Sequence, residues 1–164
     1  MASAPQPGRT LLVASSGGHL LQLWQLRDLW PASQRHWVTF DRPDARSLLA
    51  DENVTYAFHP TNRNIPNLLR NLRLSVQVGR ELRPRAVITT GAGVALPFCL
   101  VGRLLGARIV FIESLTRIHR PSLTARLVHP WAHDFFVQWP ELKGRFRKAR
   151  YEGTVFDLPE PRNA

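Results

Sequence analysis

Short apolar runs alternate with glycine-marked turns and helical stretches along the whole chain, and this order constrains the fold more than any other feature. The apolar runs span residues 10–14, 36–40, 54–58, 86–90, 108–113, 134–138 and 151–155. Helical periodicity is visible over residues 19–30, 44–50, 65–83, 94–105 and 122–128. We therefore predict an α/β fold, a Rossmann-like parallel sheet with helices on both faces, whose ligands sit outside the carboxyl ends of the strands.

The chain of 164 residues is long enough for one substantial core. We expect a single domain over residues 9–156, with tails at 1–8 and 157–164 that carry no apolar run to pack. Its one cysteine, Cys99, lies in an apolar stretch and predicts a buried thiol in a reducing compartment. We expect no secretory leader and no transmembrane segment, and therefore a cytoplasmic location.

The formal net charge of +10, from 22 basic and 12 acidic side chains, predicts an anionic partner. A phosphorylated ligand, an anionic lipid and a nucleic acid remain open on charge alone. Nearly all of the basic residues are arginines, and a genome rich in G and C would produce that bias without any function. No nucleic-acid-binding motif is present, so we expect no nucleic-acid partner.

The stretch 65–83 is amphipathic, with leucines and Val76 on one face. The other face carries the arginines in and just before this stretch, which are Arg63, Arg70, Arg73 and Arg80. Such a helix can rest on an anionic membrane, or it can be an ordinary surface helix with its apolar side on the sheet. Both interpretations stay open.

The segment 15–20, SSGGHL, joins the first strand to the first helix. Its small residues Ser16, Gly17 and Gly18 allow close approach of a phosphate or diphosphate to backbone N–H groups. His19 follows and is either a general base or a capping residue. Asp41 suits a ribose-binding acid, but the full G-x-G-x-x-G pattern of nicotinamide cofactors is missing, as is the phosphate-loop pattern, so no cofactor is expected.

Two further strand ends carry candidate residues. Gly91 and Gly93 form a second glycine turn, which predicts a second contact with the anion. Glu113 ends a buried strand, where a carboxylate is functional or paired with Arg117 or Arg120. No cluster of metal-ligating residues is visible, so no metal is expected.

Three segments together carry a resemblance to a known family: residues 15–20, residues 89–114 and the run SLTARLVHPWAHDFFVQWPEL at 122–142. They resemble the acceptor-side subunit of split UDP-sugar transferases, both the Alg-type protein of lipid-linked oligosaccharide assembly and its PssD-type relatives in exopolysaccharide synthesis. A more distant likeness is to the amino-terminal half of the peptidoglycan lipid-intermediate N-acetylglucosamine transferase.

The resemblance implies the amino-terminal domain of a GT-B glycosyltransferase, with the UDP-sugar site on a separate catalytic subunit. It implies a diphospho-lipid sugar acceptor bound near residues 16–19, Gly91 to Gly93 and Arg117, with His19 or Glu113 as the base. Eukaryotic members carry an amino-terminal transmembrane anchor. We expect none in this chain, and therefore expect peripheral attachment to the inner face of the cell membrane through the basic helix. A non-catalytic scaffold that recruits the catalytic subunit is the alternative.

Overall fold

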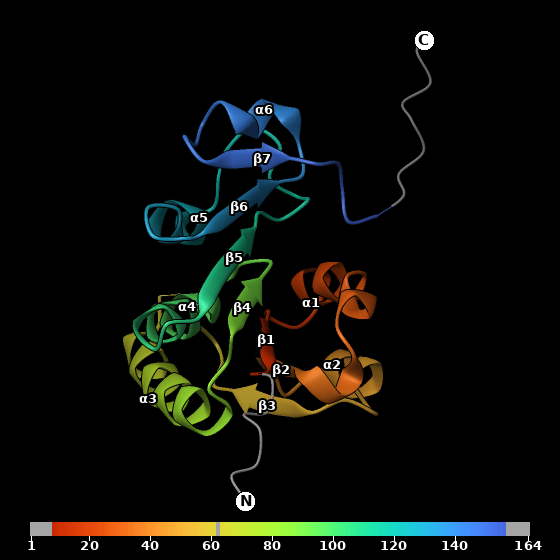
Figure 1. Cartoon of the computed structure of the whole chain (residues 1–164), viewed down its shortest axis with the longest axis vertical. Coiled ribbons are helices and arrows are strands. Elements are labelled where there is room, and N and C mark those ends of the chain that lie inside the picture. Colours follow the sequence, from red (N-terminus) through yellow and green to blue (C-terminus); the bar gives the residue numbers. More distant parts are fainter. Residues whose placement is uncertain (1–7, 62, 157–164) are drawn as a thin grey trace, which may run out of the picture.

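A parallel seven-stranded sheet organises the computed structural model, which describes residues 8–61 and 63–156 (Figure 1). The strands are β1 (Thr10–Val13), β2 (Arg35–Phe40), β3 (Val54–Ala57), β4 (Ala86–Thr89), β5 (Arg108–Ile112), β6 (Asp134–Val137) and β7 (Ala149–Tyr151). Their spatial order is β3-β2-β1-β4-β5-β6-β7. The predicted Rossmann-like α/β fold is confirmed.

The order of the strands reverses between β1 and β4, near the middle of the sheet. Thr10 pairs with Arg35 of β2 on one side and with Ala86 of β4 on the other, so β1 is hydrogen-bonded along its length on both edges. The chain builds outward from β1 to β3 and then returns to start β4 beside β1. Such a reversal leaves a crevice at the carboxyl ends of the two central strands, where ligands of this fold class bind.

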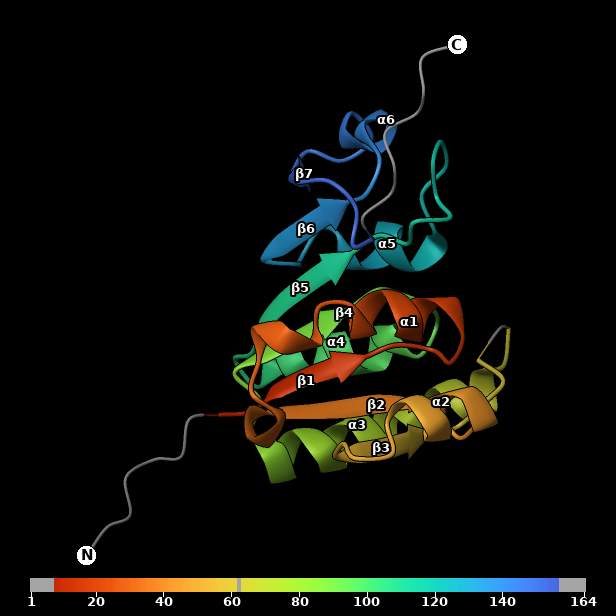
Figure 2. The same cartoon turned by 90° about the vertical axis from the view of Figure 1, so that its right-hand side faces the viewer.

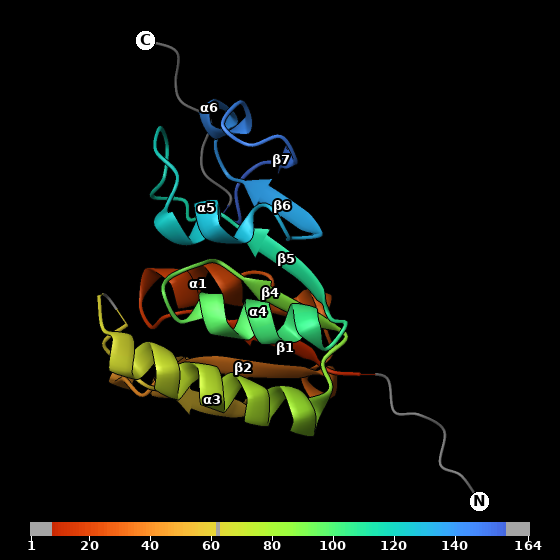
Figure 3. The same cartoon turned by 90° about the vertical axis from the view of Figure 1, so that its left-hand side faces the viewer.

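Helices cover both faces of the sheet (Figures 2 and 3). On one face lie α1 (Gly18–Trp24) and α2 (Pro43–Leu48), packed over Leu12, Trp37 and Ile88. On the other face lie α3 (Ile65–Leu82), α4 (Ala95–Leu104) and α5 (Leu123–Val128). The side chains of a strand alternate between these two cores, which explains why every residue of β1 is buried.

The two halves of α3 present different side chains to the core. Its buried face carries Asn67, Asn71 and Ser75, whereas Ile65 and Leu69 are 69% and 60% exposed. Asn71 bonds both the N–H and the carbonyl of Phe58, and Asn67 donates to the carbonyl of Pro60. In this first part of α3 the polar face points inward because it satisfies the backbone of the preceding loop, whereas Leu74, Val78 and Leu82 further along the helix pack on the core.

Several boundaries also differ from expectation. The helix expected over 19–30 ends at Trp24 and gives way to 3-10 turns at Arg27–Leu29 and Ala32–Gln34. Arg35 donates to the carbonyls of Arg27 and Trp30, which fixes this tighter path.

At the carboxyl end, a short helix α6 (Pro140–Lys143) was not expected. The last strand is Ala149–Tyr151 rather than 151–155, because the N–H of Val155 bonds the side chain of Gln138 instead of a strand. The expected tails lie outside the described residues, apart from Gly8. None of the helices in residues 8–61 and 63–156 combines the length and apolar character needed to cross a bilayer.

Candidate functional site

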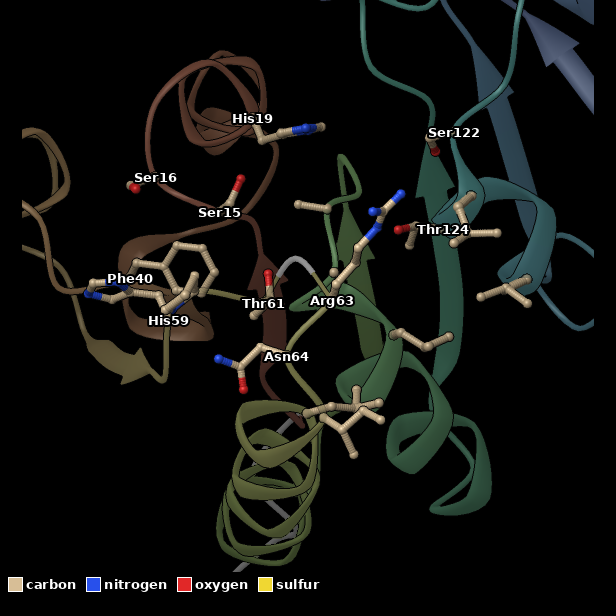
Figure 4. Close-up of a pocket in the computed structure, with 18 of the residues that line it drawn as sticks. Ser15, Ser16, His19, Phe40, His59, Thr61, Arg63, Asn64, Ser122 and Thr124 are labelled. Atoms are coloured by element: carbon tan, nitrogen blue, oxygen red, sulfur yellow. The ribbon is translucent and has the colours of Figure 1, made fainter.

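A cavity of about 980 Å³ opens at the carboxyl ends of the strands, beside the β1–β4 reversal (Figure 4). It is bordered by the loops that follow β1, β2, β3, β4 and β5. Its polar lining includes Ser15, Ser16, His19, Thr61, Asn64, Ser122 and Thr124. Its apolar lining is grouped on α3, α4 and α5, as Ile65, Leu68, Leu96, Leu123 and Leu127. The cavity is therefore amphiphilic: loops supply most of its polar lining, and α3, α4 and α5 supply a leucine-rich wall.

The charged residues that line the cavity are all basic. They are Arg42, Arg63 and Arg117, joined by the imidazoles of His19 and His59. Among the described lining residues there is no aspartate or glutamate. A concave site with several cations and no compensating carboxylate favours an anionic ligand.

His19 is held in one orientation at the edge of the cavity. Its Nδ1 lies 2.8 Å from the carbonyl oxygen of Thr90, and the hydroxyl of Thr90 donates to the carbonyl of His19 at 2.7 Å. Because a carbonyl oxygen only accepts, the neutral ring carries its proton on Nδ1 and its lone pair on Nε2. Burial lowers the pKa of His19 below 6.5, partly opposed by the bond to Thr90. The ring is thus neutral at pH 7 and able to accept a proton.

The two glycine turns shape the cavity in different ways. Gly17 adopts φ 80°, and its N–H donates to the carboxylate of Asp44 at 2.6 Å, so this donor is already engaged. Gly91 adopts φ 100°, a backbone conformation that favours glycine, and packs beside the ring of His19. Of the glycines expected at the anion, Gly93 lines the cavity, whereas Gly17, Gly18 and Gly91 form its supporting turns.

Glu113 lies under the cavity floor rather than in the lining. Only 1% of it is exposed, and its two oxygens accept the N–H groups of Ser114 and Ser122 at 2.9 and 2.8 Å. The carboxylate therefore ties the two ends of the loop 114–122 together. That loop carries Arg117 into the cavity.

A buried glutamine joins this loop to the first helix. The side-chain oxygen of Gln22 accepts from the N–H of Leu115 and from Gln138, and its amide nitrogen donates to Gly18 and Ser114. Gln22 is 4% exposed. The network couples the glycine turn that holds His19 to the loop that holds Arg117.

The four arginines assigned to a membrane surface separate into two groups. Arg63 precedes α3 and lines the cavity. Arg70, Arg73 and Arg80 are exposed on α3 itself.

Sequence reasoning missed the contribution of the loops after β2 and β3. Phe40, Arg42, His59, Thr61 and Asn64 all line the cavity. Each of them ends or follows an apolar run, so the carboxyl-end rule applied to β1, β4 and β5 would also have found these residues.

The fold and the cavity at its strand reversal place the chain in the class of Rossmann-like α/β domains found in GT-B glycosyltransferases. Residues 58–155 match the family described as "Oligosaccharide biosynthesis protein Alg14 like", and the chain belongs to this family. It is 28% identical to the UDP-N-acetylglucosamine transferase subunit ALG14 of Homo sapiens, over 88% of this chain and 82% of that one. The corresponding subunit of Rattus norvegicus is 26% identical over the same shares.

Solved structures share the fold at low identity. MurG of Acinetobacter baumannii superposes with a TM-score of 0.67 at 18% identity, over 81% of this chain and 42% of that one. The UDP-GlcNAc 2-epimerase of Neisseria meningitidis, bound to UDP-GlcNAc, gives a TM-score of 0.70 at 11% identity, over 89% and 46%. The chain thus spans less than half of each of these two proteins.

Proposed function

We propose that this chain is the acceptor-binding subunit of a two-component glycosyltransferase, built as one domain over residues 9–156. The observation that supports it most is the amphiphilic cavity, which has arginines and no acidic side chain among its described lining residues and a leucine-rich wall beside them. A lipid-linked diphosphate sugar has the same division, because its diphosphate is anionic and its chain is apolar. Ser16, Gly93 and Arg117 line the polar part and would contact the diphosphate.

The donor site would lie on a partner subunit that binds a UDP-sugar. Two observations support this division of labour. The human relative is named a subunit of a UDP-N-acetylglucosamine transferase. The chain also aligns with 42% of the length of MurG, the share that one of the two domains of a GT-B fold would occupy. The sugar transferred would be N-acetylglucosamine or a close relative.

His19 acts as the general base in this proposal. Nε2 accepts the proton of the acceptor hydroxyl while the hydroxyl oxygen attacks the anomeric carbon of the donor. The bond from that carbon to UDP breaks, the configuration inverts, and the partner stabilises the departing diphosphate. Glu113, with both oxygens engaged by backbone N–H groups, positions the loop of Arg117 instead of taking the proton.

The outward side of α3 would hold the protein at the inner, cytoplasmic face of the cell membrane. Leu69 of α3 is 60% exposed and Leu104 of the adjacent helix α4 is 77% exposed. Arg70, Arg73 and Arg80 are exposed on the same helix as Leu69. Apolar side chains flanked by arginines fit an anionic lipid surface. The leucine-rich cavity wall begins on the same helix, so a lipid chain could enter the cavity from the bilayer.

Transfer assays with the purified chain, its partner and both together test the proposal. We expect transfer from UDP-sugar to a lipid-diphosphate sugar only with both subunits present. Robust transfer by this chain alone would contradict it. The scaffold alternative predicts full activity of His19→Ala and Glu113→Ala in the reconstituted pair, whereas the proposal predicts loss with the complex intact.

A further inference from the structure

Arg63 occupies an unusual position between the helix surface and the cavity. It lies in the loop between β3 and α3, two residues before the helix begins, with φ at 50°. Figure 4 shows its side chain extending from this loop toward Thr124 and Ser122 on the far side of the cavity. A left-handed backbone is uncommon for a residue with a long side chain and often marks a functional position.

Among the residues that the structure describes, Arg63 has no carboxylate within salt-bridge distance. The arginines that form ion pairs there are Arg27, Arg35, Arg46, Arg108 and Arg150, and neither Arg63 nor Arg117 is among them. Both of these arginines line the same cavity, one from the loop after β3 and one from the loop after β5. Arg42, from the loop after β2, lines the cavity as well. Cations that enter one concave site from both sides of the β1–β4 reversal favour a shared anion.

Arg63 also lies at the boundary between the polar and the apolar lining of the cavity. Immediately after it, Ile65 and Leu68 begin the leucine-rich wall, whereas Thr61 and Asn64 belong to the polar lining. In a lipid-linked sugar, the diphosphate is the group that joins the apolar chain to the polar sugar. A ligand with its chain on the wall and its sugar near His19 would place the diphosphate beside Arg63.

We infer that Arg63 is a diphosphate ligand and forms a two-sided clamp with Arg117 on the lipid-linked acceptor. The planar guanidinium donates two parallel hydrogen bonds to phosphate oxygens, which a lysine ammonium does not reproduce. This inference rests on the proposed function and assigns to Arg63 the role of binding the acceptor rather than the membrane. The donor's diphosphate is the other possible source of the same chemistry.

Steady-state kinetics of the reconstituted pair distinguish binding of the acceptor's diphosphate from binding of the donor's. The assay uses a short-chain lipid-diphosphate sugar in detergent. We expect Arg63→Gln to raise the KM for the acceptor by roughly 10- to 100-fold, in line with lost charge-assisted hydrogen bonds, while the KM for the UDP-sugar stays within about twofold. Arg63→Lys should fall between wild type and Arg63→Gln. Arg147→Ala, which removes an exposed arginine outside the cavity lining, is the charge-matched control and should leave both KM values unchanged.

A lipid monophosphate of the same chain length provides the second readout, as a competitive inhibitor. The wild-type pair should bind the diphosphate more tightly than the monophosphate, and Arg63→Gln should lose most of this preference. An unchanged acceptor KM in a folded Arg63→Gln pair, or a rise confined to the donor KM, would overturn the inference. A wild-type pair with no affinity for lipid diphosphates would instead refute the proposed function, so the two failures are distinguishable.

Discussion

Nδ1 of His19 lies 2.8 Å from the carbonyl oxygen of Thr90, a residue 71 positions further along the chain. This bond joins the turn after β1 to the turn after β4 and leaves Nε2 without a proton. The reciprocal bond from the hydroxyl of Thr90 to the carbonyl of His19 closes the pair. The geometry fixes both the direction of the ring and its tautomer, which are the two requirements for a general base.

Replacement of His19 by Ala should lower kcat of the reconstituted pair by roughly 10²- to 10⁴-fold, the usual contribution of general acid–base catalysis. The KM for the acceptor should change little, because the arginines still bind it. Size-exclusion chromatography would show whether the complex with the partner is intact. Near-wild-type kcat in an intact complex would remove His19 from the mechanism.

The pH profile should show the neutral form of His19 as the active one. Since burial lowers the pKa of His19, its acid limb in kcat/KM is expected below pH 6.5, with a plateau at neutral pH. The unfolded chain takes up this proton near the ordinary pKa, so protonation favours unfolding and folding stability also falls as the pH drops below 6.5. An NMR titration of the His19 ring measures the pKa directly, and a value above 6.5 would be inconsistent with this account.

Gln22 should stabilise the fold as well as the site. Gln22→Ala leaves the N–H of Leu115 and the amide of Gln138 without this acceptor. We expect the free energy of unfolding to fall by about 2–5 kcal/mol, because each buried polar group left unsatisfied costs about 1–3 kcal/mol. Chemical denaturation of the isolated chain measures this change. Gln25→Ala, at an exposed glutamine three residues later, is the control and should stay within about 0.5 kcal/mol of wild type.

Membrane attachment through α3 predicts that Leu69→Gln weakens binding to anionic vesicles by roughly tenfold or more, because a buried leucine contributes about 1.5–3 kcal/mol. Co-sedimentation with phosphatidylcholine vesicles, with and without phosphatidylglycerol, is the measurement. Leu29→Gln is the matched control, because Leu29 is 69% exposed but lies in the 3-10 turn after α1. Equal losses for the two variants would argue against a surface specific to α3.

The parallel sheet was predictable because apolar runs that alternate with helical stretches are typical of buried parallel strands. The order of the strands and the directions of the side chains were not predictable in this way. Glu113 was correctly expected at a strand end, yet its carboxylate turns to the N–H groups of Ser114 and Ser122 instead of the cavity. No periodicity in the sequence shows where a loop will present its N–H groups.

The orientation of α3 was ambiguous for a related reason. Leu74 and Leu82 pack on the core as hydrophobicity predicts, but nearer the start of the helix Asn67 and Asn71 are buried because they bond the backbone at Phe58 and Pro60. Arg63 was grouped with the helix on spacing, although the helix begins only at Ile65 and the loop turns Arg63 into the cavity. The burial of the two asparagines depends on hydrogen bonds between α3 and the loop before it, and the place of Arg63 depends on the path of that loop. Both become visible only in three dimensions.

Equilibrium binding to the isolated chain tests the central claim most directly. A fluorescent short-chain lipid-diphosphate sugar and a fluorescent UDP-sugar would be titrated separately into this subunit without its partner. The account predicts saturable binding of the lipid diphosphate, weakened by Arg117→Ala, and no comparable binding of the UDP-sugar. Tight binding of the UDP-sugar with none of the lipid diphosphate would contradict it, because the chain would then be the donor half of the enzyme.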